Sequence, residues 1–125
     1  MVCIDTSIWV LSWRQNGGEV WHDLRELILA DQAALCGQVW VELIGGFRSE
    51  ERRMTNTRRL HGYPWLDTSR TAYELAAEWI ASFKGIGAGD AIIAATAFLN
   101  DSPLFTVDRS FESLRGAGLK LFKSK

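Results

Sequence analysis

Short apolar runs recur along the chain and predict buried strands. The first, VCID at residues 2–5, ends in an acid and leads into Thr6 and Ser7, which suits a strand followed directly by a helix. The run AALC at 33–36 has the same length and apolar character. Further strands are predicted at residues 64–66, 103–107 and 119–122. Runs this short are typical of the interior strands of a sheet.

Helical spacing of apolar residues fills the intervals between these runs. Val20, Leu24 and Leu27 recur at this spacing, and the segment 88–100 is apolar nearly all round, which predicts a helix at the centre of the domain. Helices are expected over about 19–30, 38–47, 49–60 and 88–100. A further helix is expected from an N-cap at Thr68 or Ser69 to Gly85, and a short one immediately before the last predicted strand. Strands that alternate with helices predict an α/β fold with a mainly parallel central sheet.

Composition narrows the class of protein. The 125 residues are 47% hydrophobic and 23% charged, which is typical of one globular domain spanning 1–125. No run approaches the roughly 20 apolar residues of a membrane span, and the N-terminus lacks a signal-peptide pattern, so we expect a cytoplasmic protein that does not enter a membrane. The net charge of −1 does not by itself point to a polyanion partner. Cys3 and Cys36 lie in apolar runs and are expected to be reduced core thiols.

Three aspartates stand at the ends of predicted elements. Asp5 ends the first strand, Asp90 lies at the start of the central helix, and Asp108 follows the strand at 103–107. Ligands of parallel α/β sheets bind at the carboxyl edge of the strands, where helices also begin, so these carboxylates are expected to share one crevice. Each aspartate alternatively fits a helix N-cap, a role that stabilises a helix by about 1 kcal/mol.

Glu42 is an acid inside the apolar segment VWVELIGG, where a capping role is not available. It projects either from an exposed stripe of its helix or into a buried site. If the four acids converge, two carboxylates about 4 Å apart repel by about 4 kcal/mol at an effective dielectric of about 20, and a bound divalent cation would relieve that repulsion. An all-oxygen ligand set favours Mg²⁺ or Mn²⁺ over Zn²⁺, and acid-only magnesium sites mostly act on phosphates.

At these positions the sequence resembles the PIN-domain ribonucleases, in particular the VapC-type toxins of toxin-antitoxin pairs. The resemblance rests on four segments in the family's order, which are VCIDTSIW, VELIGGFRSEER, GDAIIAATA and LFTVDRSF. It covers nearly the whole chain and implies a single PIN domain, a three-layer α/β/α sandwich with a mainly parallel central sheet.

The resemblance also implies the members of the site. The ligands of one or two Mg²⁺ or Mn²⁺ ions would be Asp5, Glu42, Asp90 and Asp108. Ser7 and Thr106 match polar positions that support such a cluster, whereas Ser110 stands where many family members carry a further acid. The implied activity is that of a Mg²⁺-dependent endoribonuclease, and the implied partners are RNA, a VapB-like antitoxin and a second copy of the chain in a homodimer.

Basic side chains near the acids are candidates for holding the phosphate backbone of RNA. These residues are Arg48, Arg52, Arg53 and Arg109. Each of them is alternatively an ordinary solvated residue, because charged runs usually form exposed faces.

Other enzyme classes fit the sequence less well. Covalent catalysis by Ser7 or Cys3 needs a base, and the two histidines, His22 and His61, lie in polar segments. A metal-dependent phosphatase that forms a phosphoaspartyl intermediate also places an acid at the end of the first strand, but it usually needs a second acid where Ser7 stands. The glycines between 85 and 89 do not form a nucleotide-binding G-x-G-x-x-G after a first strand and suit the start of a helix.

A non-catalytic metal-binding or protein-interaction module is the remaining alternative. Trp9 and Trp13 stand one helical turn apart and, together with Trp21, could line an apolar groove for a partner's helix. Core packing is the other use of these residues.

Overall fold

A parallel sheet forms the centre of the molecule. The computed structural model describes residues 1–14 and 18–123. Its strands are β1 (Val2–Ile4), β2 (Ala33–Cys36), β3 (Trp65–Leu66) and β4 (Leu104–Phe105). The order in the sheet is β3-β2-β1-β4, and every pairing is parallel. The predicted α/β fold is therefore confirmed.

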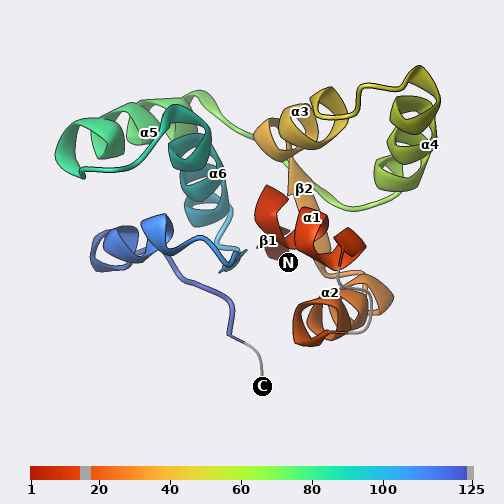
Figure 1. The fold of residues 1–125 in the computed structure, drawn as a ribbon. Coiled ribbons are helices and arrows are strands. Elements are labelled where there is room, and N and C mark those ends of the chain that lie inside the picture. The colour runs from red at the N-terminus through yellow and green to blue at the C-terminus, as the bar shows by residue number, and fades with distance from the viewer. Residues whose placement is uncertain (15–17, 124–125) are drawn as a thin grey trace.

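Helices cover both faces of this sheet. They are α1 (Thr6–Arg14), α2 (Glu19–Leu29), α3 (Gly37–Gly45), α4 (Glu50–His61), α5 (Arg70–Ser82), α6 (Ala88–Leu99) and the 3₁₀ helix η1 (Arg109–Ala117). In the view of Figure 1, α5 and α6 lie to the left of the strands, and α2 and α4 lie to the right. This arrangement gives the three layers that were expected.

The core is built where the strands meet α6. Cys3 in β1 is in register with Ala34 in β2 and with Leu104 in β4, and all three are fully buried. Helix α6 buries its small residues Ala91, Ala94, Ala95 and Ala97, which lets it pack closely against its neighbours. The predictions of a central helix and of two buried, free cysteines are both confirmed.

The order of the strands defines one edge where a ligand can bind. From β1 the chain builds outward through β2 to β3, then returns to the other side of β1 to form β4. The strand order therefore reverses between β1 and β4, and the carboxyl ends of these two strands are where a ligand of such a sheet is expected to bind. Asp5 follows β1 and Thr106 follows β4, and the Asp5 backbone N–H donates to the carbonyl of Phe105 at 2.9 Å.

The end of the chain differs from the sequence prediction. The expected strand at 119–122 is a single parallel bridge between Leu121 and Leu104. It is preceded by Gly118, whose φ of +109° belongs to the left-handed region and which ends η1. After the turn at Gly118, Leu121 alone pairs with Leu104, so residues 119–122 do not form the expected strand.

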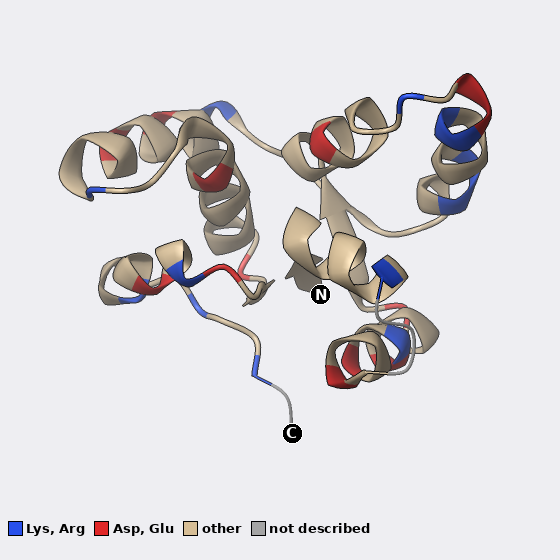
Figure 2. Cartoon of the chain, in the orientation of Figure 1, with Lys and Arg blue, Asp and Glu red and all other residues tan. Residues whose placement is uncertain are grey.

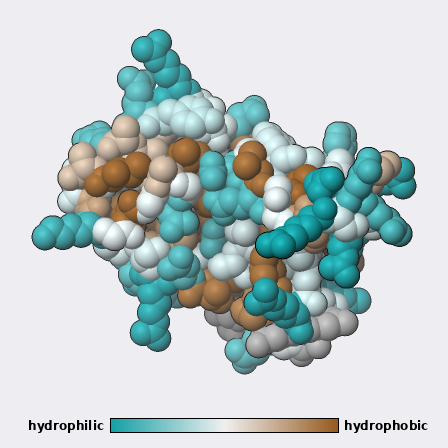
Figure 3. All heavy atoms as spheres, turned by 45° about the horizontal axis from the view of Figure 1, so that its top comes forward, coloured by the Kyte–Doolittle hydropathy of each residue, from teal (hydrophilic) through white to brown (hydrophobic). Residues whose placement is uncertain are grey.

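Exposed apolar side chains are spread over several elements. On the face shown in Figure 3, hydrophobic residues gather on the left, over the α5 and α6 side, and hydrophilic side chains project around them.

No helix within residues 1–14 and 18–123 is both long enough and apolar enough to cross a bilayer.

Candidate functional site

Asp5 is a buried carboxylate at the carboxyl end of β1. It is 4% exposed, and its Oδ2 accepts hydrogen bonds from the Ser7 hydroxyl at 2.6 Å and the Thr106 hydroxyl at 2.8 Å. The two hydroxyls are themselves 3.3 Å apart. Both donors are hydroxyls, and no backbone N–H of the described residues donates to this carboxylate, so the side chain of Asp5 does not act as the N-cap considered for it. Its backbone carbonyl accepts from the N–H of Ile8 at 3.0 Å. The supporting positions predicted at Ser7 and Thr106 therefore lie against Asp5.

Glu42 reaches the same edge of the sheet from α3. Its Oε1 accepts from the Thr6 hydroxyl at 2.6 Å, and its Oε2 accepts from the Gln38 side-chain amide at 2.9 Å. The side chain is half-buried, so Glu42 does not lie on the exposed stripe that the sequence left open. Thr6 is the residue next to Asp5, and this hydrogen bond joins the start of α1 to α3.

Asp90 and Asp108 approach from the opposite side. Asp90 is the third residue of α6, whose N-cap is Gly87, so Asp90 is not a capping residue. Asp108 does cap, because its Oδ1 accepts from the backbone N–H of Ser110 at 2.9 Å. The Ser110 hydroxyl makes a long contact of 3.5 Å with Oδ2 of Asp90. Ser110 thus contacts both acids, and Figure 2 shows acidic positions on α3, α6 and the segment before η1.

The charge of the cluster acts on Asp90. Burial raises the pKa of this carboxyl, and the negative charges of Asp5, Asp108 and Glu42 raise it further. Within the described ranges no Lys, Arg or His forms an ion pair with any of these four acids. The fold therefore concentrates like charge at one edge of the sheet without a compensating cation from the protein.

The donor set suits a hard divalent cation. The side chains gathered at this edge of the sheet offer carboxylate and hydroxyl oxygens, and oxygens are the ligands that Mg²⁺ and Mn²⁺ prefer. Across residues 1–14 and 18–123, however, no three His, Cys, Asp or Glu side chains are already grouped closely enough to hold an ion. The acids are instead fixed one by one, through hydrogen bonds to Thr6, Ser7, Gln38, Thr106 and Ser110.

The four candidate arginines have different surroundings. The guanidinium of Arg53 donates to the backbone carbonyls of Phe47 at 2.9 Å and Arg48 at 3.1 Å, which holds the turn between α3 and α4. Arg52 lies on the exposed surface of α4, where basic residues gather (Figure 2). Arg109 is exposed and directly follows Asp108. Arg48, Arg52 and Arg109 therefore have accessible side chains, whereas Arg53 has a structural role.

An apolar groove lies between α1, α2 and α4. It encloses about 290 Å³, and its lining includes all three tryptophans that the sequence singled out. Trp13 is 37% exposed and packs on Phe47, whereas Trp9 is buried and packs on Tyr63. The indole Nε1 of Trp9 is buried without a hydrogen-bond partner among the described residues. Arg25 and Arg59 add positive charge to the lining.

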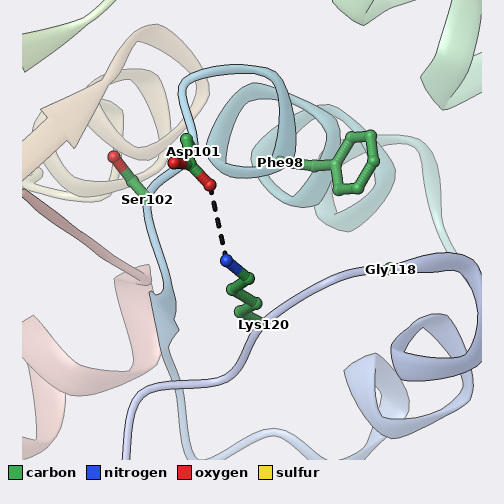
Figure 4. A pocket seen from close by; sticks show the side chains of 5 residues that line it. All are labelled: Phe98, Asp101, Ser102, Gly118 and Lys120. Atoms are coloured by element: carbon green, nitrogen blue, oxygen red, sulfur yellow. Dashed lines mark ion pairs between the residues drawn. The ribbon is translucent and has the colours of Figure 1, made fainter.

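A smaller hollow lies between α6 and the segment after η1. It encloses about 60 Å³ and is lined by Phe98, Asp101, Ser102, Gly118 and Lys120 (Figure 4). Asp101 and Lys120 form an ion pair across it at 3.6 Å, with both side chains exposed. A Cβ at position 118 would lie 2.8 Å from the ring of Phe98, which explains the glycine. None of the four clustered acids lines this hollow.

Four residues of the site were not assigned a role there from the sequence. Gln38 stands four residues before Glu42, a helical spacing that a search for side-chain pairs on one helix face could have found. Thr6 bonds to a residue 36 positions away, and Ser110 to one 20 positions away, so neither contact has a local signal. Gly89 had been attributed to the start of a helix, yet a Cβ there would lie 2.8 Å from Glu42 Oε2.

Fold and site together define an α/β protein with a cluster of acids at the point where a parallel sheet reverses its order. The sequence matches the PIN domain family over residues 2–117, so the chain belongs to that family. PIN domains are generally nucleases. No curated protein matches the chain.

Solved structures share this fold at low sequence identity. The DNA-bound VapBC from Salmonella typhimurium matches with a TM-score of 0.76 and 22% identity, covering 98% of each chain. VapBC2 from Rickettsia felis, bound to a promoter DNA fragment, matches with a TM-score of 0.75 and 21% identity over 100% of both chains. FitAcB from Neisseria gonorrhoeae matches with a TM-score of 0.71 and 24% identity, over 98% of this chain and 97% of that one.

Proposed function

We propose that the protein is a Mg²⁺-dependent endoribonuclease and the toxin of a toxin-antitoxin pair. The observation that carries the proposal is the position of Asp90 within electrostatic reach of Asp5, Asp108 and Glu42, at the carboxyl edge of the sheet. Membership of a generally nucleolytic family and the fold shared with VapBC complexes support it.

The four acids would hold the cation, with Mn²⁺ as a possible substitute for Mg²⁺. When bound, a divalent ion lowers the pKa of a water molecule and neutralises phosphate oxygens. The residues of the chain supply positioning for this chemistry. Ser7 and Thr106 fix Asp5, and Thr6 fixes Glu42, while the exposed Arg48, Arg52 and Arg109 would attract the RNA backbone.

The competing catalytic classes have less support. A hydrogen bond with Cys36 and burial raise the pKa of the Cys3 thiol well above its usual range, so it stays protonated and is a poor nucleophile. His22 is exposed and pairs with Glu26 on α2, away from Ser7. A phosphoaspartyl phosphatase usually needs a second acid where this chain has Ser7, and the Ser7 hydroxyl instead donates to Asp5 at 2.6 Å.

The activity can be tested directly on RNA. Purified protein incubated with total cellular RNA should cut it when Mg²⁺ is present, and EDTA should stop the reaction, because the acids cannot organise a phosphate without a cation. The cut ends are mapped by primer extension. Cleavage that continues in EDTA would contradict the metal requirement, and intact RNA under all conditions would contradict the nuclease.

A small antitoxin is the partner that we propose for the apolar groove. The similar structures include a toxin-antitoxin complex from Klebsiella pneumoniae and the two DNA-bound VapBC complexes. In this chain, the groove offers exposed aromatic surface, an unpaired Trp9 N–H and two arginines at its lining. An amphipathic helix with an acidic residue would match that surface, because its apolar face would cover the tryptophans and its acid would pair with Arg25 or Arg59.

Truncation of one groove tryptophan should weaken this complex. Trp13→Ala removes an exposed indole from the lining, and we expect about a tenfold loss of affinity for the proposed antitoxin, which is to be sought as a short reading frame immediately upstream. The affinity is measured by calorimetry. Trp65→Ala is the matched control, since Trp65 is 49% exposed and also packs on an aromatic ring but lies outside the groove. Equal losses in both variants would argue against this docking site. The proposed homodimer is checked separately by sedimentation of the purified protein.

A further inference from the structure

Two uncharged residues beside Glu42 control where its carboxylate lies. We propose that Gln38 and Gly89 are positioning residues, which hold Glu42 in one orientation for cation binding. This inference rests on the proposed function and adds residues to the same site.

Gln38 fixes one oxygen of the carboxylate. It lies one helical turn before Glu42 on α3, and its amide donates to Oε2 at 2.9 Å while Thr6 donates to Oε1 at 2.6 Å. A carboxylate with a donor on each oxygen cannot rotate freely about its last torsion. Each oxygen still has a second lone pair with which to contact a cation. The pair of donors therefore orients Glu42 and leaves it able to bind.

Gly89 supplies the space in which this arrangement fits. A Cβ at position 89 would lie 2.8 Å from Glu42 Oε2 and 3.0 Å from Gln38 Nε2. Gly89 lies within α6 and does not have a positive φ, so its backbone does not require glycine. Alanine is the better helix former at such a position. The absence of a side chain lets α6 approach α3 closely while Glu42 stays within electrostatic reach of Asp90.

The inference predicts opposite effects on stability and on metal binding. In Gly89→Ala the clashing atoms are the ends of two flexible side chains, so the fold can adjust while the carboxylate and amide move. We expect a melting temperature that is unchanged or higher, together with about a tenfold weaker affinity for Mn²⁺. Gln38→Leu removes the donor and should weaken Mn²⁺ binding by a similar factor.

The affinity for Mn²⁺ alone is measured by electron paramagnetic resonance on the full chain, and stability by thermal unfolding without metal. Gly45→Ala is the matched control, because it replaces a helical glycine on α3 with no atom within 4 Å of the new Cβ. A second readout needs no metal: the side-chain amide signal of Gln38 in NMR spectra should shift in Gly89→Ala and in Glu42→Gln, and stay in place in Gly45→Ala.

The outcomes separate this inference from the proposed function. Wild-type Mn²⁺ affinity in both Gly89→Ala and Gln38→Leu, or an unmoved Gln38 signal, would overturn the inference and leave the nuclease proposal standing. Failure of the unmutated protein to bind Mn²⁺ would overturn the proposed function and this inference with it. Weaker binding in both variants with normal binding in Gly45→Ala would support the assignment.

Discussion

Asp90→Asn is expected to abolish RNA cleavage while the domain stays folded and becomes slightly more stable without metal. Asparagine keeps the size of the side chain and removes the charge that a cation would contact. We expect the rate of cleavage to fall by about a hundredfold or more, measured with Mg²⁺ in excess.

The gain in stability follows from the raised pKa of Asp90. Burial and the charges of Asp5, Asp108 and Glu42 disfavour the ionised carboxyl in the folded state more than in the unfolded chain. The folded protein therefore binds this proton more tightly, and stability decreases as the pH rises from the ordinary aspartate pKa through the raised one. Above the raised pKa, asparagine avoids the free-energy cost of an ionised carboxyl at this position in the folded state. The difference in melting temperature, a few degrees at most, should disappear in acid, where both forms are neutral.

An exposed aspartate outside the site provides the control. Asp67→Asn removes the same charge from the exposed loop before α5, outside the acidic cluster, and should leave cleavage nearly unchanged. A normal cleavage rate in Asp90→Asn would remove Asp90 from the site. If Asp90→Asn is less stable than the unmutated protein at neutral pH, another contact stabilises the ionised Asp90 carboxylate in the folded state, and the expected gain in stability is wrong.

Thr106→Val should lower both stability and cleavage, because the hydroxyl of Thr106 serves two acids. It donates to the buried Asp5 at 2.8 Å and accepts from the backbone N–H of Asp108 at 3.0 Å. Valine has the same shape without the hydroxyl, and loss of a donor to a buried charge costs about 1–3 kcal/mol. We expect the melting temperature to fall by several degrees and cleavage to fall by about tenfold to a hundredfold.

Thr106→Ser separates the hydroxyl from the shape of the side chain. Serine keeps the donor and loses only a methyl group, so it should retain most of the stability and activity that valine loses. Thermal unfolding and cleavage are measured on the same preparations. If serine and valine behave alike, packing of the methyl group matters more than the hydrogen bond to Asp5, and the account of this pair is wrong.

The local pattern of apolar and polar residues predicts most of the helices and strands. The apolar run at 33–36 is β2, and the apolar segment from residue 88 is the central helix α6. Ser69, one of two predicted caps, accepts from the N–H of Ala72 at 3.1 Å. These features depend on residues close together in sequence, which is why the pattern predicted them. The last strand was mispredicted because LKLF has strand character, whereas the turn at Gly118 limits it to one bridge.

The site was only partly predictable. Acids at the ends of strands and at a helix start indicate a shared binding edge by topology alone, and the structure brings Asp5, Glu42 and Asp108 within electrostatic reach of Asp90. The groups that orient them depend on contacts between distant segments. The guanidinium of Arg53, an RNA-binding candidate because of its charge, also donates to backbone carbonyls of the α3–α4 turn. The sequence carries no sign of these hydrogen bonds, because charge alone does not show what a side chain contacts.

The hydrogen bond between Asp5 and Thr106 joins residues 101 positions apart. Because β4, the last strand of the sheet, pairs directly with β1, the hydrogen bonds around Asp5 are complete only after residues 104–106 have been synthesised. A nascent chain of about a hundred residues therefore lacks β4, Thr106 and Asp108 and cannot complete the acidic cluster. For the nuclease proposed above, we expect a product truncated before Thr106 to be inactive.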